Sequence, residues 1–419
     1  MRGLLGFSAG RVFQLVVIII AGAAANYAAS AVGPLQETMR IALALTDNQM
    51  AMLQGPALYL PPIAAAIPLG FIIDRFSRAR LLVIFTALEV LGSVLTALAP
   101  SFFVLLAARA LVGLMLCAIA MNASALVAEF VAPNQRGRTI MILGVAQIAA
   151  MSAAFALGGN LVAHFGSGPD GWRWAMLGLA APLSVVFVLT FLVREPLRID
   201  ITPRKSSLRS ASSELWRYRA MMLPLSVGPV VVGMGYMASL VWAAPILARN
   251  FNLPPDRVGA IMGLVLLVSG VLGALLGGVL SDLCQRTGGP RRTISLMIGL
   301  ALLQVPAGFF GVMPSVLLVS VLLAMLCTIS YMKGVICAAL STVVIPNELR
   351  GLCFGVQNAI GSALVSVSPV LVSLLAGRIG GPASIGGSLT VVCVGTSLLG
   401  ATTFAFGRGY FPQRTGPVH

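Results

Sequence analysis

Three charged side chains interrupt long apolar stretches of this sequence, and they are the first candidates for chemistry. Glu89, Arg109 and Lys333 each lie inside a run long enough to cross a bilayer. A charge at membrane depth is costly and is a functional candidate by default. Arg109 begins the pattern Arg-x-x-x-Gly, which ends at Gly113. Two cations at this depth predict contacts with an anionic group.

Two interpretations stay open for Lys333 and for Glu89. Lys333 has no acidic residue within a helical turn, so it would either give up its proton or bind an anion such as a substrate. It also lies past the midpoint of its helix, so its long side chain could instead reach the cytoplasmic surface. Glu89 would either carry a transported proton or pair with Arg109.

Polar and aromatic residues also occur inside the apolar runs. Tyr236 and Ser239 are three positions apart and therefore share a helix face. Each such residue alone more often supports helix packing, but together they are compatible with an amphipathic cavity. The residues selected as substrate contacts, with Arg109 and Lys333, are Asn26, Tyr27, Tyr236, Trp242 and Asn358.

Two motifs occur twice, about half a chain length apart. The pattern Gly, three residues, Asp and then basic residues starts at Gly70 and again at Gly278. A second pair is Pro133-Asn134-Gln135-Arg136-Gly137 and Pro346-Asn347-Glu348-Leu349-Arg350-Gly351. Each copy lies between two long apolar segments. A membrane chain made of two similar halves is the usual design of a secondary transporter, with its site between the halves.

These repeated charges predict a conformational gate. A carboxylate that begins a short cytoplasmic turn can lie at the N-terminus of a neighbouring helix, where free N–H groups favour an anion. Nearby Arg side chains would then pair across the cytoplasmic face in one state and separate in the other. The alternative is that the charges only set the topology. The gate candidates are Gly70, Asp74, Arg75, Arg78, Glu129, Arg136, Asp282, Glu348 and Arg350.

The composition requires that these residues be positioned by membrane helices. The chain is 58% hydrophobic and 9% charged, against about 25% charged residues in a soluble domain. Without barrel-type alternation, the spans should be helices. We predict an all-α membrane protein of twelve transmembrane helices near 12–34, 50–73, 81–99, 102–130, 139–163, 172–194, 220–248, 258–281, 293–311, 314–343, 353–376 and 385–407.

The distribution of charge predicts the topology and the domains. A net charge of +15 could suggest nucleic acid, but the basic residues gather in alternate loops. This asymmetry places both termini in the cytoplasm. Residues 195–219 form the one long polar stretch. We therefore predict a six-helix bundle at 1–194, a cytoplasmic linker at 195–219, and a second bundle at 220–419 with a short cytoplasmic tail. The basic residues in the opposite loops are Arg40, Arg173, Arg249, Arg257 and Arg378.

No set of residues suited to catalysis is found. The chain has two His residues and shows no metal-ligand spacing, no phosphate loop and no Ser-centred nucleophile motif. Its six Cys residues lie mostly in apolar segments and are predicted to be free thiols. We expect no enzymatic activity, cofactor, metal or nucleic-acid partner. The expected partners are a small-molecule substrate, membrane lipid and protons, and the expected state is a monomer.

Taken together, the motifs resemble the major facilitator superfamily, and more narrowly its bacterial Spinster-like branch. Gly171-Trp172-Arg173-Trp174 is similar to the superfamily's start of helix 6. Asn26-Tyr27, Asp74-Arg75-Phe76-Ser77-Arg78 and Val193-Arg194-Glu195-Pro196 resemble the branch. The resemblance implies a major facilitator fold with helices 1, 4, 7 and 10 around a central cavity. It implies substrates that are small amphipathic molecules, lipids or organic acids, often coupled to protons.

The sequence also departs from the branch it resembles. The branch usually follows Asn-Tyr with an apolar residue and then Asp-Arg, whereas this chain reads Asn26-Tyr27-Ala28-Ala29-Ser30. The branch usually has a Glu in helix 4, where this chain has Leu116. Both usual protonation carboxylates of the first half are missing. Glu89 therefore remains as the internal proton-coupling candidate.

Our leading interpretation is a secondary active transporter of the bacterial cytoplasmic membrane that works by alternating access. Two buried cations against one buried carboxylate favour an anionic or amphipathic organic substrate. One alternative is a proton-coupled exporter of drugs, metabolites or lipids. An alternative of another class is a transporter-like sensor or binding protein without flux.

Overall fold

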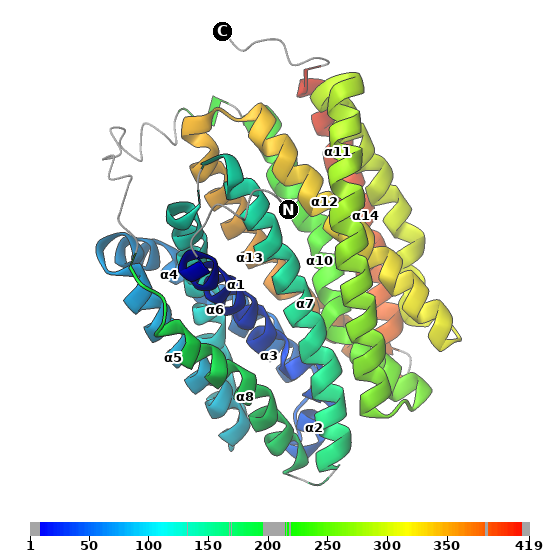
Figure 1. Cartoon of the computed structure of the whole chain (residues 1–419). Helices are drawn as coiled ribbons and strands as arrows, with labels where there is room; N and C mark the ends of the chain where they lie inside the picture. Colours follow the sequence, from blue (N-terminus) through cyan, green and yellow to red (C-terminus); the bar gives the residue numbers. More distant parts are fainter. Residues whose placement is uncertain are drawn as a thin grey trace. The chain divides into compact units, whose positions relative to one another are not determined.

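The structure is a computed structural model in which every regular element is a helix (Figure 1). It describes residues 9–412 except 132, 167, 169, 196–213, 215, 218 and 382–383. It leaves eight further side chains undescribed, at 9, 133, 134, 137, 347, 348, 350 and 351. Two of the predicted gate residues, Glu348 and Arg350, therefore have side chains outside the described part.

The helices fall into two series along the chain, separated by residues 196–213. Before this stretch they are α1 (Ala9–Ser30), α2 (Val32–Ala42), α3 (Asp47–Gln54), α4 (Pro56–Arg75), α5 (Arg78–Leu98), α6 (Phe102–Phe130), α7 (Pro133–Phe165) and α8 (Gly171–Thr190). After it they are α10 (Arg219–Phe251), α11 (Pro255–Ala307), η1 (Gly308–Val312), α12 (Val316–Val344), α13 (Asn347–Ile379), α14 (Ser384–Gly407) and η2 (Arg408–Tyr410).

Eleven helical stretches among the described residues are long and apolar enough to cross a membrane. One of these stretches is long enough to contain two spans. The stretch Pro255–Val312 has 58 residues, which would extend about 87 Å at 1.5 Å per residue, against an apolar thickness of about 30 Å. Gly289 interrupts it with φ 63° and ψ −162°, a conformation suited to glycine, and Pro290 follows. The chain turns there, which confirms the prediction of twelve spans.

The first two spans are each built from two helical pieces. α1 and α2 are joined at Ala31, and α3 and α4 at Gly55. The first span continues to Ala42, beyond the predicted end at residue 34. The predicted end was too early because α2 is amphipathic. It buries Val32, Leu35 and Met39 on one face, while Glu37 and Arg40 form an ion pair on the other side.

The helices pack into two compact units. The first comprises Met1–Ile201 with Leu253–Leu267, and the second comprises Thr202–Asn252 with Val268–His419. Residues 196–213 of the predicted linker lie outside the described part of the chain. The start of α11 joins the first unit through small residues, since a Cβ on Gly159 of α7 would lie 2.9 Å from the Cα of Gly259. The hydroxyl of Ser152 also donates to the Gly263 carbonyl at 2.6 Å.

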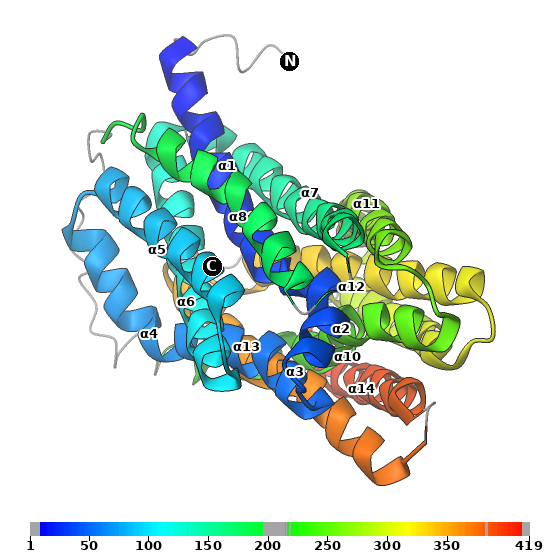
Figure 2. The same ribbon diagram turned by 90° about the horizontal axis from the view of Figure 1, so that it is seen from below.

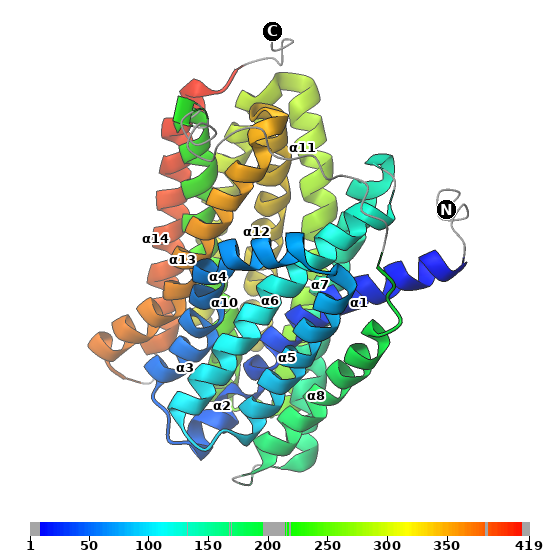
Figure 3. The same ribbon diagram turned by 90° about the vertical axis from the view of Figure 1, so that its left-hand side faces the viewer.

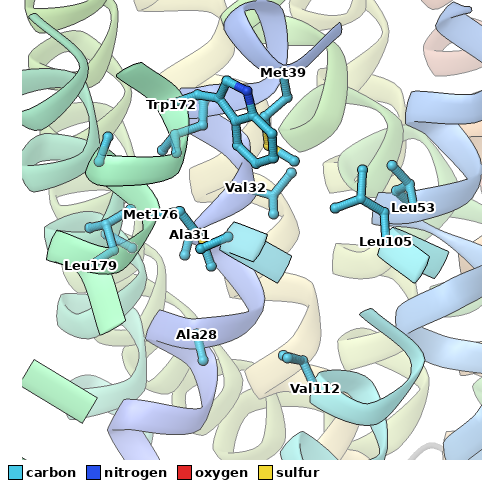
Figure 4. Packing of buried hydrophobic residues seen from close by; sticks show 14 of the residues in the cluster. Ala28, Ala31, Val32, Met39, Leu53, Leu105, Val112, Trp172, Met176 and Leu179 are labelled. Carbon is cyan, nitrogen blue, oxygen red and sulfur yellow. The ribbon is translucent and has the colours of Figure 1, made fainter. Parts of the chain in front are cut away.

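Within the first unit, α1, α7 and α8 lie side by side (Figure 2). α6 packs between α4 and α5 (Figure 3). Side chains from α1, α2, α3, α6 and α8 meet in one apolar cluster, where Trp172, Met39 and Leu105 are buried (Figure 4). In the second unit, α10 packs along α14 and α13. Many large apolar side chains are exposed instead, such as Ile67 and Phe406, each 85% exposed, as expected of a surface that faces lipid.

Candidate functional site

The break in the first span is the place where α6 contacts α1. α1 ends at Ser30 and α2 begins at Val32, so the last carbonyls of α1 lack some of their usual partners. Arg109 of α6 fills this gap. Its Nη1 donates to the Ala28 carbonyl at 3.3 Å and its Nη2 donates to the Ala29 carbonyl. The side chain is fully buried. The guanidinium therefore stabilises the broken end of a membrane helix.

Gly113 explains the second half of the Arg-x-x-x-Gly pattern. A Cβ at Gly113 would lie 2.1 Å from the carbonyl oxygen of Leu58, so only glycine lets α4 approach α6 this closely. The next residue on α4, Tyr59, is near enough to Arg109 for an electrostatic interaction. The motif thus positions α1, α4 and Tyr59 around one guanidinium. Sequence reasoning did not select Tyr59, which no spacing rule connects with Arg109.

The charge of Arg109 has no carboxylate partner among the residues that the structure describes. Its Nε is buried and makes no hydrogen bond to any residue that the structure describes. The predicted pairing of Glu89 with Arg109 is not present in the described part of the chain. A buried cation whose hydrogen bonds within the described structure go to neutral carbonyls retains a strong preference for an anion.

The two candidates before the break, Asn26 and Tyr27, lie on α1. The amide of Asn26 donates to the Gly22 carbonyl of its own helix at 3.4 Å. Tyr27 is 6% exposed, and its buried hydroxyl makes no hydrogen bond within the described structure. Tyr27 thus offers a free polar group one residue before the carbonyl that Arg109 binds.

Glu89 lies on a polar stripe along α5. Thr86, Glu89 and Ser93 are spaced three and four residues apart and are nearly fully buried. The hydroxyls of Thr86 and Thr190 of α8 are 3.3 Å apart. Glu89 Oε1 and Ser93 Oγ have no hydrogen-bond partner in the described structure. A carboxyl group in this setting is far less costly when uncharged.

In the second unit, the aromatic candidates differ in their surroundings. The hydroxyl of Tyr236 on α10 donates a hydrogen bond to the hydroxyl of Tyr331 on α12 at 2.9 Å. The two rings pack edge to face, with their centroids 5.6 Å apart. Both are half-buried. Trp242 is fully buried, and its ring N–H donates to the Pro369 carbonyl of α13 at 3.0 Å. Trp242 therefore joins α10 to a proline-containing helix.

Lys333 and Asn358 lie in unlike positions. The ammonium of Lys333 donates to the side-chain oxygen of Gln304 in the second half of α11. Lys333 is 3% exposed, so in this structure it does not reach the surface. Asn358 is exposed on α13. The preceding residue, Gln357, donates from its side-chain amide to the Ser341 hydroxyl of α12 at 3.3 Å.

The first copy of the gate motif forms a connected polar cluster. Arg78 pairs with Glu129 of α6 and lies 3.7 Å from Asp74. The amide of Asn122 donates to the Arg78 carbonyl at 2.9 Å. Asp74 itself is largely exposed, whereas the predicted role of a carboxylate at a helix N-terminus is taken by Glu195.

Glu195 is the main residue of this polar cluster that sequence reasoning missed. One of its oxygens accepts from the backbone N–H of Arg78 at 3.0 Å, and the other accepts from the N–H of Ala79 at 2.8 Å and from the hydroxyl of Ser77 at 2.6 Å. Glu195 follows α8 in the sequence, and it thereby caps the N-terminus of α5, which lies more than 100 residues earlier in the chain. The available signal is its place in Val193-Arg194-Glu195-Pro196, a motif that resembles the Spinster-like branch.

The remaining gate candidates are more peripheral. Arg75 lies over the ring of Phe71 at 5.8 Å. Arg136 donates to the Val131 carbonyl at 3.4 Å. A Cβ on Gly70 would make only an ordinary 3.7 Å contact with Met121. Asp282, in the second copy of the motif, is exposed on α11.

Comparisons with known proteins agree with this architecture. The family model described as Major Facilitator Superfamily matches residues 15–369. Crystal structures of a bacterial homolog of the human lysosomal transporter Spinster, inward-facing and either unoccupied or occupied, have TM-scores of 0.85 and 0.82 at 18% identity. Each alignment covers 98% of this chain and 100% of the other. The fold thus resembles that of the Spinster-like branch.

Curated relatives match over shorter stretches. The putative niacin/nicotinamide transporter NiaP of Bacillus subtilis (strain 168) is 26% identical over 194 residues, which are 45% of this chain and 47% of that protein. The human proton myo-inositol cotransporter is 28% identical, over 48% of this chain and 30% of its own length. Solute carrier family 22 member 1 of Oryctolagus cuniculus is 28% identical, over 34% of this chain and 24% of its own length. The matches thus span about a quarter to a half of these relatives.

The family model covers most of the sequence, and the helical fold agrees with it. The assignment also places the protein among multi-pass membrane transporters rather than enzymes, as the lack of catalytic motifs predicted. The chain therefore belongs to the Major Facilitator Superfamily.

Proposed function

We propose that this protein is a secondary active transporter that moves a small organic anion, or an amphipathic molecule with an anionic group, by alternating access. The observation that carries the proposal is the buried guanidinium of Arg109, which has no carboxylate partner among the described residues. We place the protein in the bacterial cytoplasmic membrane as a monomer with both termini inside. The orientation of the termini rests on the positive-inside pattern of the sequence.

The electrostatics of Arg109 favour an anionic substrate. The Ala28 and Ala29 carbonyls satisfy two of its N–H groups but do not neutralise its charge. The unused Nε–H is the donor that a carboxylate, sulfonate or phosphate would accept from. Hydrogen bonds between ionised partners are roughly twice as strong as neutral ones. An organic anion would therefore complete the site, and the Tyr27 hydroxyl supplies a second free donor close by in sequence.

The second unit supports an amphipathic substrate body. Tyr236 and Tyr331 offer two ring faces and two hydroxyls in a half-buried pair. Aromatic side chains combine a large apolar surface with a polar end. We propose this tyrosine pair as a substrate contact of the second unit. In the first unit, we propose Asn26, Tyr27 and Arg109 as substrate contacts. We assign Trp242 to helix packing, because its N–H is already bonded to the Pro369 carbonyl.

A ligand screen on the purified protein tests the anion specificity. Organic anions, neutral analogues and organic cations are compared by the shift of the unfolding temperature in wild type and Arg109→Gln. The matched control is Arg138→Gln, which removes an exposed cation from α7. We expect anions to stabilise the wild type and the control, but not Arg109→Gln. A preference for cations that Arg109→Gln leaves unchanged would reject the proposal.

Counterflow in liposomes then tests transport itself. Vesicles loaded with unlabelled ligand should exchange it for labelled ligand outside if the protein is a carrier. A sensor or binding protein would bind the same ligand without exchange. Binding without counterflow would therefore support the anion-binding site but reject the transport function.

Glu89 supports a second candidate function, a proton-coupled exporter. Its carboxyl group is buried, and Oε1 is unpaired within the described structure. Such a group can bind and release a proton when its surroundings change between states. Glu89→Gln should then abolish transport driven by a pH gradient but retain counterflow, while Ser93→Ala on the same stripe should change little. Normal gradient-driven transport in Glu89→Gln would leave Glu89 with a structural role.

A further inference from the structure

The second unit contains a polar contact that the substrate proposal does not use. The ammonium of Lys333 on α12 donates to the side-chain oxygen of Gln304 on α11. Lys333 is 3% exposed and Gln304 is fully buried. The amide nitrogen of Gln304 makes no hydrogen bond in the described structure. A cation and an unused donor thus lie together inside this unit.

The surroundings of this pair are apolar. One helical turn around Gln304 adds Leu300 and Ala301, and one turn around Lys333 adds Ile329 and Ile336, all members of a single buried cluster. After residue 219, the acidic side chains of the sequence are Asp256, Asp282 and Glu348. The first and last belong to the opening turns of α11 and α13, and Asp282 is exposed. Among the described residues, no carboxylate forms an ion pair with Lys333.

The pair is separate from the tyrosines proposed as substrate contacts. Lys333 and Tyr331 are two positions apart on α12, which is about 200° around a helix. Tyr331 contacts Tyr236 of α10, whereas Lys333 contacts the second half of α11. The ligand of Lys333 and Gln304 therefore need not be the organic substrate.

The unfilled groups define what the ligand must be. The ammonium has three N–H donors, of which the described structure uses one, and the Gln304 amide has two that are unused. The unused N–H groups of both side chains are donors, so the partner that they lack is an acceptor. The uncompensated charge requires that acceptor to be an anion. The tight apolar packing favours a small, monovalent one.

We propose that Lys333 and Gln304 bind a chloride-sized inorganic anion between α11 and α12. The anion would neutralise Lys333 and connect the two helices. This inference goes beyond the proposed transport function, because it assigns a second site with a different ligand. It stands on the geometry of the second unit and does not depend on Arg109.

Halide titrations of the purified full-length protein test the site without any substrate. Protein in chloride-free gluconate buffer is titrated with chloride and bromide, and binding of radioactive chloride is measured with the unfolding temperature. We expect saturable binding in wild type that is at least tenfold weaker in Lys333→Met and in Gln304→Leu. Arg292→Met, which removes an exposed cation from α11, is the matched control and should bind like wild type.

Gln304→Glu provides a second, independent variant. It places a carboxylate beside Lys333 and should therefore replace the anion. We expect it to raise the unfolding temperature in chloride-free buffer and to remove the dependence on halide. This variant keeps the proposal testable if Lys333→Met does not fold.

Two results would overturn the proposal. Saturable halide binding that is unchanged in both Lys333→Met and Gln304→Glu would place the anion elsewhere. No halide binding in wild type would mean that Lys333 is accommodated uncharged against Gln304. Neither result would affect the organic-anion screen on Arg109, so the two proposals fail separately.

Discussion

Replacing Gly113 by Ala would push a methyl group into the backbone of α4. The new Cβ would lie 2.1 Å from the Leu58 carbonyl oxygen and 2.6 Å from the Leu58 carbonyl carbon and Cα. All three are backbone atoms of a helix, so no side-chain rotation relieves the contact. The two helices must separate, and overpacking of this kind costs about 1–3 kcal/mol. We expect the free energy of unfolding of Gly113→Ala to be about 3 kcal/mol lower than that of wild type, at the upper end of this range.

The matched control is Gly334→Ala in α12, where a Cβ meets no atom within 4 Å. There the substitution should be neutral or stabilising by about 0.5–1 kcal/mol, because Ala is the better helix former. The free energy of unfolding of both variants is measured in the same detergent with a graded denaturant. A second readout is ligand binding, since separating α4 from α6 should move Tyr59 away from Arg109. Equal stability of the two variants would refute the close-packing explanation of the Arg-x-x-x-Gly motif.

Three further predictions follow from contacts in the two units. Glu195→Ala removes the acceptor of the Arg78 and Ala79 N–H groups and should cost about 1 kcal/mol, seen as faster hydrogen exchange at the first turn of α5; unchanged exchange would mean that the carboxylate does not cap the helix in solution. Tyr236→Phe and Tyr331→Phe should each cost about 1 kcal/mol, and the double variant should cost little more than either alone; additive losses would show that the hydroxyls do not pair. Trp242→Phe removes the donor to the Pro369 carbonyl and should lower stability by at least about 1 kcal/mol, and a thermal unfolding curve like that of wild type would contradict this.

The fold could be predicted from the sequence because lipid constrains it strongly. Long apolar runs predict helices, and the repeated Asp motifs predict two similar halves. The broken first span was not predictable. Its break at Ala31 is stabilised by Arg109, some 80 residues further along the chain, and hydropathy carries no information about such a contact.

The candidate site was predicted in part, through its charges. Burial of Arg109, Lys333 and Glu89 follows from their place in apolar runs, and the structure buries all three. Their partners could not be predicted, because Tyr59 and Gln304 are uncharged and lie on other helices. The capping role of Glu195 could not be predicted either, because it depends on a contact between the segment after α8 and the start of α5.

The most direct test of the account is a structure of the protein with an anionic ligand from the screen bound. We predict that the ligand's anionic group lies about 3 Å from Nε of Arg109, the distance of a charge-assisted hydrogen bond. A bound ligand that does not contact Arg109, with the guanidinium still bonded only to the Ala28 and Ala29 carbonyls, would contradict the assignment of Arg109 as the anion-binding residue.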